Sequence, residues 1–142
     1  GTLEWTIEGD NWFWAGAATD GKTVFAPNMD GNIYAIDRNG NLLWKHNVGS
    51  AIVSSPVLVP SGLVVAAKDG DLLLLDTRAG DLGLQRVLFN WRIGEAEIKA
   101  PLFAVGNSVY IGSQDRTVRR VEFSNGLRDV WCVDTREGRC NN

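Results

Sequence analysis

The sequence predicts an all-β fold of about three four-stranded antiparallel blades plus one extra strand. Glycine accounts for 16 of the 142 residues. Gly, Asp and Asn recur between runs of Val, Ile, Leu, Trp and Tyr, which is typical of strands joined by turns. No window of about a dozen residues shows the 3.6-residue period of an amphipathic helix. Finally, tryptophans recur at intervals of about 40 residues, and four antiparallel strands in that length make one blade of a β-propeller.

The tryptophan repeat sets the boundaries of the predicted units. Trp5, Trp44, Trp91 and Trp131 are separated by 39, 47 and 40 residues, and the intervening segments share one order of strands and turns. We expect a single domain over residues 1–142 that forms part of a propeller. Its predicted units are an extra strand over residues 2–7, blades over residues 11–48, 51–94 and 97–135, and a tail over residues 136–142.

Each predicted blade begins with two strands joined by a short turn that contains glycine. The turns are Asp20-Gly21, Ser61-Gly62 and Gly106-Asn107, and a short turn between two apolar runs indicates a hairpin. The first strands are expected at residues 12–18, 52–59 and 98–105, and the second strands at residues 23–27, 63–67 and 108–112.

The third strand of each blade follows a second polar turn. These turns begin at Asp30, Asp69 and Asp115. A further turn then leads to a fourth strand that carries the tryptophan. The third strands are expected at residues 33–37, 72–76 and 118–123.

The first blade carries the most informative motif. Ala35, Asp37, Gly40 and Trp44 follow the pattern Ala-x-Asp-x-x-x-Gly-x-x-x-Trp, with one residue fewer before the glycine. The pattern resembles the repeat of the PQQ-binding-like, or BamB-like, propeller family. A WD40 blade would need Gly-His and Trp-Asp pairs, but the single His46 follows a lysine, and the Gly-Gly pair of kelch repeats is absent.

The other two blades keep looser versions of the motif. Leu84 stands at the tryptophan position of the second blade, so the segment before Trp91 reads as a lengthened fourth strand or a bulge. In the third blade, Phe123 replaces the aspartate. The resemblance implies that each tryptophan docks between neighbouring blades, while the Asp and Gly shape the receiving turn. It assigns this structural role to Trp44 with Asp37 and Gly40, and to Trp5, Trp91 and Trp131.

Two segments resemble phosphate- or calcium-binding motifs but are better explained as turns. Residues 16–23 match the P-loop pattern, but that chemistry needs a helix opening at Lys22-Thr23, and here a run ending in Pro27 follows. We therefore expect a hairpin turn that binds no nucleotide. Residues 37–41 alternate oxygen-bearing side chains but lack the glycine and the final acid of an EF-hand loop.

The cysteine and histidine inventory argues against catalytic and zinc sites. One His and two Cys form no Cys/His cluster with suitable spacing, and we expect His46 on a solvated strand face. Quinoprotein dehydrogenases share this blade, and the resemblance implies a quinone site with two adjacent cysteines and a calcium ion. Cys132 and Cys140 lie eight residues apart, so no cofactor is expected; they are either a disulfide or two free thiols. PQQ with calcium is the alternative if the chain belongs to a dehydrogenase.

Charge and hydropathy restrict the partners. The net charge is −3 and no stretch is dominated by Lys and Arg, which argues against nucleic acid and anionic membranes. The apolar runs are far shorter than the roughly 20 residues of a membrane span. The N-terminus shows no leader pattern and leaves the compartment open, whereas the family resemblance implies the periplasm or cell envelope.

The predicted ring is incomplete. A closed propeller needs about 4–8 blades, so the chain is expected to be either a piece of a longer protein or a protomer completed by copies or partners. We expect a non-enzymatic scaffold that binds protein or a small ligand, with a segment of a PQQ-dependent dehydrogenase as the alternative. The expected binding loops contain Glu8, Asp10, Asn11, Trp12, Asp30, Asp69, Asp71, Glu95, Glu97, Asp115 and Arg116.

Overall fold

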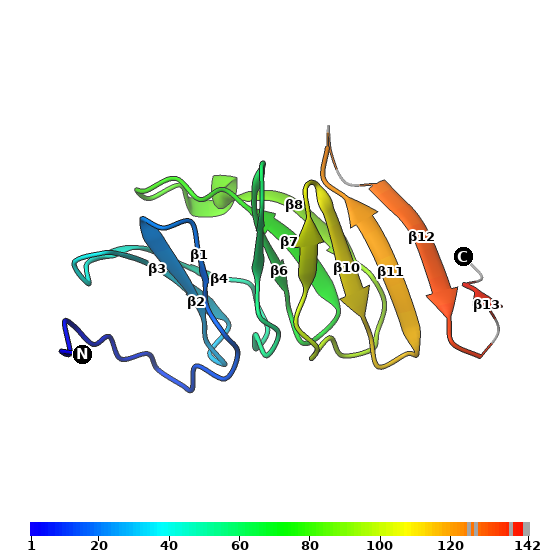
Figure 1. Ribbon diagram of the computed structural model, residues 1–142, viewed down its shortest axis with the longest axis horizontal. Helices are drawn as coiled ribbons and strands as arrows, with labels where there is room; N and C mark the ends of the chain where they lie inside the picture. The colour runs from blue at the N-terminus through cyan, green and yellow to red at the C-terminus, as the bar shows by residue number, and fades with distance from the viewer. Residues whose placement is uncertain (125, 127, 137, 141–142) are drawn as a thin grey trace.

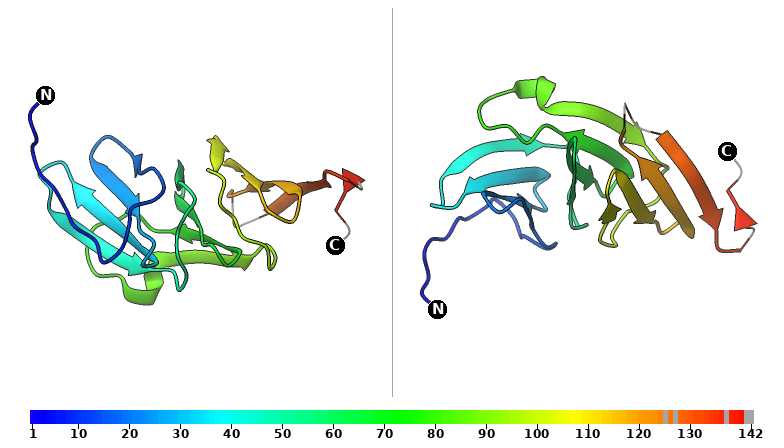
Figure 2. Two further views of the ribbon diagram at one scale, coloured as in Figure 1. Left: turned by 90° about the horizontal axis from the view of Figure 1, so that it is seen from below. Right: turned by 45° about the horizontal axis from the view of Figure 1, so that its top comes forward.

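The computed structural model describes residues 1–124, 126, 128–136 and 138–140 of the chain. Three antiparallel sheets stand next to one another along the long axis of the molecule (Figure 1), which confirms the all-β prediction. Figure 2 shows that the sheets are inclined to one another in the manner of neighbouring sectors. Within the described residues they do not close into a ring. We number these sheets blades 1 to 3 in chain order.

The strands follow the order expected for propeller blades, since each pairs with the next one along the chain. Blade 1 contains β1 (Ala18–Thr19), β2 (Thr23–Pro27), β3 (Asn32–Asp37) and β4 (Leu42–Asn47). Blade 2 contains β5 (Val57–Val59), β6 (Gly62–Ala66), β7 (Asp71–Leu75), a 3-10 helix (Gly83–Arg86) and β8 (Val87–Arg92). Blade 3 contains β9 (Phe103–Val105), β10 (Ser108–Gly112), β11 (Thr117–Glu122), β12 (Arg128–Asp134) and β13 (Gly138–Arg139).

Blade 2 shows how the core is built. Its two central strands are buried on both faces because a neighbouring blade covers each side, and they therefore read as continuous apolar runs rather than alternating ones. Leu63 and Leu73 pack toward blade 1, whereas Val64 and Leu72 pack toward blade 3. The core thus consists of two layers of side chains, one in each gap between blades.

The expected first strands are wrong in length. They were predicted over residues 12–18, 52–59 and 98–105, but β1, β5 and β9 contain two or three residues each. The preceding residues are crossovers between blades, and they use backbone groups on neighbouring loops instead of a strand partner. For example, the Ile52 amide donates to the Asn28 carbonyl.

The strand predicted over residues 2–7 is also wrong, because residues 1–17 have no regular secondary structure. Among the described residues, no strand lies beside this segment to pair with it. It runs instead along blade 1 (Figure 1), whose outward-facing Tyr34 and Ile36 are both buried.

Each blade has a register shift between its third and fourth strands, and the alignment of these shifts changes the expected role of Trp91. The pairing of the third and fourth strands slips after Ala35, after Leu74 and after Arg120. The residues opposite these positions are Trp44, Phe89 and Trp131, so Phe89 takes the Trp44 position in blade 2. Trp91 pairs instead with Leu72 and matches His46, which pairs with Ile33. The extra residues of blade 2 form a 3-10 helix rather than a lengthened strand or bulge.

The same pairing corrects the acidic position of blade 3. Asp37 lies opposite Thr23, and Glu122 lies opposite Ser108. Glu122 is therefore the equivalent of Asp37, and Phe123 is not. It also acts as a turn acid, because its carboxylate accepts hydrogen bonds from Ser124 and Arg128.

Candidate binding surfaces

The loops expected to bind a partner lie at one end of the molecule, at the bottom of Figure 1. They are the turns between second and third strands together with the crossovers between blades. A series of backbone hydrogen bonds links them across all three blades. The bonds run from Met29 to Trp12, from Ile52 to Asn28, from Lys68 to Ala51 and from Gln114 to Glu97. We refer to this surface as the loop end.

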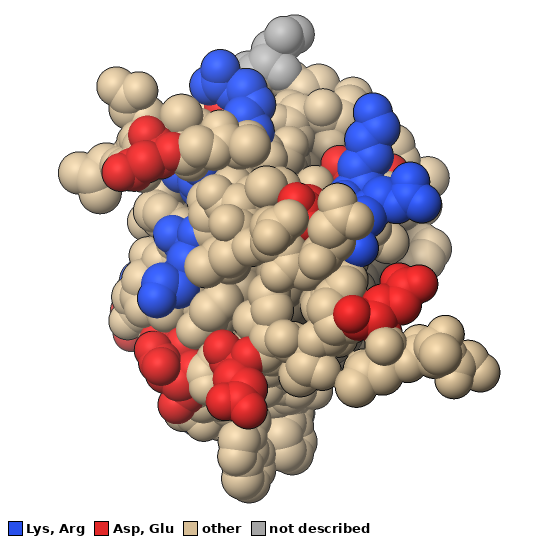
Figure 3. Space-filling view, turned by 90° about the vertical axis from the view of Figure 1, so that its left-hand side faces the viewer, with Lys and Arg blue, Asp and Glu red and all other residues tan. Residues whose placement is uncertain are grey.

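Four of the eight acidic residues expected at the loop end have a basic partner. Arg92 lies 3.3 Å from Asp69, 3.1 Å from Asp71 and 3.9 Å from Glu95. Three of the expected acidic binding residues therefore serve one arginine, a pairing that sequence spacing did not reveal. Figure 3 looks at the side of the molecule formed by blade 1, where acidic side chains gather at the lower left and others lie at the upper left and right near Lys and Arg.

Glu97 is also engaged, since it lies 2.7 Å from Lys99 and 3.6 Å from Lys68. The Lys99 side chain is the main cause that lowers the pKa of the Glu97 carboxyl. Its two lysine partners share this one carboxylate, so the group of three carries a net positive charge.

Two further acids shape the turns that contain them. Burial alone would raise the pKa of Asp30, but the Tyr34 hydroxyl at 2.7 Å and the Asn32 amide at 2.7 Å bring it below its ordinary value. Asp115 behaves in the same way through Thr117. Both carboxyls are therefore ionised at neutral pH and act as turn acceptors.

The remaining expected loop residues differ in role. Glu8 and Asp10 are exposed, and the Asn11 carbonyl accepts a hydrogen bond from Asn28 Nδ2 at 2.8 Å. Arg116 is exposed and has a φ of 70°. It occupies the turn position where the other blades have glycine, so its backbone is strained.

The loop end exposes a pair of aromatic side chains. Trp12 and Trp14 are 69% and 66% exposed, and their rings lie 6.4 Å apart with only 11° between their planes. The intervening Phe13 points the other way and packs edge-on against Tyr34 at 5.4 Å. A groove of about 210 Å³ lies beside the pair. It is lined by Trp12, Trp14, Met29, Val53, Lys68 and Lys99, and we call it the tryptophan groove.

Tryptophans dock on the turns of the following unit, and the structure corrects which turn receives which ring. The Asp37–Gly40 turn receives Trp5, whose Nε1 donates to the Arg38 carbonyl at 3.0 Å. A Cβ on Gly40 would lie 2.7 Å from the Trp5 ring. Trp44 docks on the equivalent turn of blade 2, and its Nε1 lies 3.4 Å from the Thr77 carbonyl. Both acceptors lie 33 residues beyond their tryptophan.

Arg86 completes the Trp44 dock, and the sequence analysis missed it. The side chain is buried, and its guanidinium carbon lies 3.9 Å from the Trp44 ring centroid. Its nitrogens donate to the carbonyls of Asp76, Arg78 and Gly80. Arg86 therefore closes the whole turn that receives Trp44.

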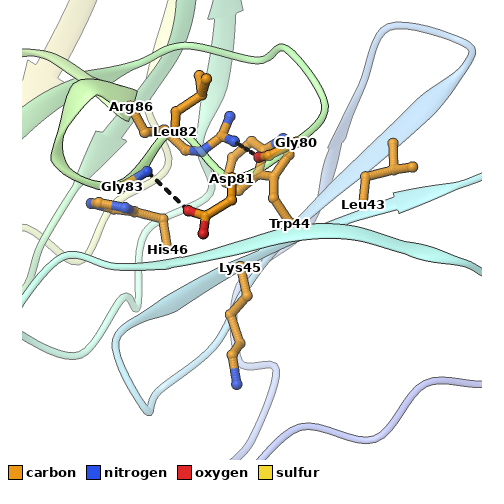
Figure 4. Close-up of a pocket in the computed structure, with 9 residues that line it drawn as sticks. All are labelled: Leu43, Trp44, Lys45, His46, Gly80, Asp81, Leu82, Gly83 and Arg86. Atoms are coloured by element: carbon orange, nitrogen blue, oxygen red, sulfur yellow. Dashed lines mark hydrogen bonds between the residues drawn. The ribbon is translucent and has the colours of Figure 1, made fainter.

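A second pocket, of about 330 Å³, opens beside this dock (Figure 4). Figure 4 shows His46 and Asp81 on its wall and Lys45 pointing away from it. His46 is half-buried and not on a fully solvated face, as had been expected. Burial, followed by the charge of Arg86, lowers the pKa of His46 below its ordinary 6.5.

We expect the His46 environment to make stability depend on pH. The unfolded chain binds the imidazole proton more tightly than the folded chain, so protonation favours unfolding. The contribution is present above pH 6.5 and is lost as the pH falls below that value. Urea unfolding at pH 7.5 and 5.5 should therefore show a smaller loss for His46→Gln than for the wild type. The exposed neighbour Lys45→Gln is the control, and equal pH dependence in the wild type and His46→Gln would contradict the prediction.

The outer face of blade 3 lacks a covering blade within the described residues. The residues on this face are equivalent to residues of blades 1 and 2 that are buried against the next blade. Trp131 was expected to be buried, but it is 39% exposed because no turn receives it. The other exposed apolar residues of this face are Phe103, Val105, Val118 and Val133.

We expect this face to make the 142-residue chain self-associate, because large exposed apolar patches on soluble proteins mark interfaces. Head-to-tail stacking would send Trp131 to the Asp37–Gly40 turn, which Trp5 already fills. Face-to-face pairing of two blade 3 sheets meets no such obstacle. Residues 2–7 form no strand that could pair with another copy, so this face is the expected contact.

Sedimentation velocity at tens of micromolar tests the expectation. The wild type should sediment as a dimer, and Phe103→Lys should be monomeric while keeping the circular dichroism spectrum of the folded chain. Leu84→Lys, at another exposed apolar position, should remain dimeric. A monomeric wild type would show that the face does not pair.

The two cysteines, left open by the sequence, form a disulfide with their Cα atoms 5.4 Å apart. The Cys140 amide also donates to the Cys132 carbonyl at 3.3 Å. This link holds β13 as a fifth strand against β12, at the edge of blade 3.

The P-loop-like segment forms a hairpin turn, as expected. The amides of Lys22 and Thr23 both donate to Asp20 Oδ1, and strand β2 begins at Thr23. These bonds, led by that from Thr23, lower the pKa of Asp20. The amides that a phosphate would need are therefore already used.

Two further observations concern the described part of the chain. Within it, no group of three or more His, Cys, Asp or Glu side chains is placed to hold a metal ion. Among the described residues, no helix is long and apolar enough to cross a membrane.

The stacked blades and docked tryptophans agree with a comparison to known families. The model of the family described as outer membrane protein assembly factor BamB matches residues 1–88 and again residues 30–141. The chain belongs to this family. A comparison with curated proteins finds no match.

Solved structures confirm the BamB-like propeller fold. BamB from Moraxella catarrhalis superposes with a TM-score of 0.74 at 17% identity, over 91% of this chain and 39% of that protein. Quinohemoprotein alcohol dehydrogenase ADHIIG from Pseudomonas putida HK5 gives 0.73 at 16% identity, over 89% and 21%. A europium-containing methanol dehydrogenase gives 0.76 at 14% identity, over 93% and 27%. At these identities the similarity shows the fold, and the chain spans well under half of each relative.

Proposed function

We propose that this chain is part of a non-catalytic, protein-binding propeller of the cell envelope that serves outer membrane protein assembly. One observation carries the proposal. The loop end commits most of its acidic side chains to Arg92, to lysines and to turns, and it presents two exposed tryptophans. Rigid exposed aromatics are typical of protein-binding surfaces. Partner proteins would cover the outer face of blade 3, the same face on which copies of the isolated chain are expected to pair.

The second candidate is a segment of a quinone-dependent dehydrogenase, and the similarity to dehydrogenase structures favours it. The described residues do not fit a PQQ and calcium site. Four of the loop carboxylates, those of Asp69, Asp71, Glu95 and Glu97, are paired with basic side chains. The cysteines are not adjacent, because their disulfide joins β12 to the residue that follows β13. This mismatch supports the scaffold proposal, although further blades of a longer protein would bring groups of their own.

The test of the proposal compares cofactor binding with protein contact. Titration of PQQ with and without Ca²⁺, followed by calorimetry, should give no saturable binding. A photo-crosslinking amino acid at position 12, introduced in the native host, should form adducts with an outer membrane assembly protein, while one at position 84 should not. Calcium-dependent PQQ binding, or equal adducts from both positions, would overturn the proposal.

A further inference from the structure

We propose that the tryptophan groove binds an extended, proline-containing peptide segment with acidic residues beside the proline. The inference rests on the proposed protein-binding function and names the chemistry of the partner. It is carried by the rigidity of the tryptophan pair, the absence of a backbone ladder beside it, and the positive charge at its rim.

The tryptophan pair is held in place before any ligand arrives. The Trp12 carbonyl accepts a hydrogen bond from the Met29 amide at 2.9 Å, and Phe13 anchors the segment on Tyr34. Trp12 and Trp14 therefore project to the same side with their rings nearly parallel. Little conformational entropy is lost when such side chains bind a partner.

The size of the groove favours peptide side chains over a cofactor. Its volume of about 210 Å³ is below the roughly 300–1,000 Å³ of pockets for drug-sized ligands and cofactors. Met29 at the wall is an adaptable apolar surface.

The backbone beside the groove argues against a peptide that adds as a β-strand. Strand addition needs a sheet edge with unused amide and carbonyl groups. Here the Asn11 and Trp12 carbonyls are already bonded, and the Trp12 amide donates to the Asn11 side chain at 2.8 Å. Proline-rich segments are recognised instead by aromatic side-chain surfaces. The groove offers that kind of surface.

Charge supplies the acidic preference. Lys68 and Lys99 line the groove and share the single carboxylate of Glu97, so one positive charge remains for the ligand. A neutral sugar would also stack on tryptophan, but it would gain nothing from this charge. An acidic peptide satisfies both the rings and the lysines.

A peptide array tests the inference by measuring binding of the labelled 142-residue chain. Its ten-residue peptides vary independently in proline number and in net charge. Binding should increase with proline number and with acidic charge. Binding should fall at least about tenfold in Trp12→Ala and Trp14→Ala, because exposed tryptophans are typical hot spots of peptide and protein binding. Lys68→Gln with Lys99→Gln should remove the charge preference and keep the proline preference. Leu84→Ala is the matched control and should bind as the wild type does.

The tryptophan variants should keep the wild-type thermal midpoint, since both rings are mostly exposed. Binding that follows charge alone, binding unchanged in Trp12→Ala, or binding of neutral oligosaccharides in preference to the peptides would each overturn the inference. If position 12 crosslinks to an assembly protein but binding on the array does not vary with proline number or charge, the proposed function stands and the proline-containing acidic peptide is excluded as the ligand. The two failures are therefore distinguishable.

Discussion

Replacing Trp44 by alanine should lower the free energy of unfolding by about 3–5 kcal/mol, the range for a large aromatic lost from a core. The Trp44 side chain is only 6% exposed. It contacts Phe25 at a centroid distance of 5.9 Å and covers the guanidinium of Arg86. Its removal leaves a cavity between blades 1 and 2 and opens the buried arginine to one side.

The matched control is Trp131→Ala. Trp131 has the same register position in blade 3, opposite Arg120, but lacks a following blade to dock on. Its loss should cost about 1 kcal/mol or less, as is usual for partly exposed positions. Urea unfolding followed by circular dichroism measures both variants in the monomeric Phe103→Lys background, where Trp131 has no partner copy. Equal losses, or a loss below about 1 kcal/mol for Trp44→Ala, would contradict the interpretation of Trp44 as the wedge between blades.

The turns and central strands could be predicted because their signals are local. The pair Asp30-Gly31 requires a positive φ, and Gly31 adopts 92°. The second strand of blade 3 begins and ends at the expected residues, Ser108–Gly112. In such segments the alternation of side chains and the chemistry of the turn depend on few residues, so one sequence is sufficient.

The errors concern features that depend on neighbours in space. Phe89 takes the position expected for Trp91 because the 3-10 helix absorbs the extra residues, and no local pattern reports that register. Trp131 is exposed because burial at its position requires a following blade. The crossovers looked like strands because their apolar residues, such as Ile52, are buried between blades without being paired.

The sequence predicted where the candidate loops lie but not how their side chains are engaged. The loops do gather at one end, and Trp12 is exposed as expected. The acidic residues looked available for binding, but Arg92 reaches Asp69 from 23 residues away. Trp14 and the two lysines were missed, although the alternation of Trp12 and Trp14 about Phe13 was a signal that could have shown one exposed aromatic face.

Replacing Arg86 by leucine should lower the free energy of unfolding by about 2–4 kcal/mol. The guanidinium satisfies the carbonyls of Asp76, Arg78 and Gly80, and a buried polar group left without its partner costs about 1–3 kcal/mol. Arg86→Lys should not restore the wild-type value, because an ammonium group lacks the planar fork that reaches three carbonyls and lies flat on an indole. Burial lowers the pKa of Arg86, and the charge of Asp76 opposes that effect.

A double-mutant cycle between Trp44 and Arg86 tests whether the two residues form one dock. The guanidinium lies over the indole at 3.9 Å in a buried setting, where a cation–π contact contributes about 2 kcal/mol. Once Trp44→Ala has removed the ring, Arg86→Leu should cost about 1–2 kcal/mol less than it does in the wild type. Trp12→Ala, distant from the dock, provides the additive reference for the same Arg86 variant. If the Trp44 and Arg86 losses also add to within about 0.5 kcal/mol, the arginine only closes its turn, and the indole docks on blade 2 through packing and its hydrogen bond to the Thr77 carbonyl.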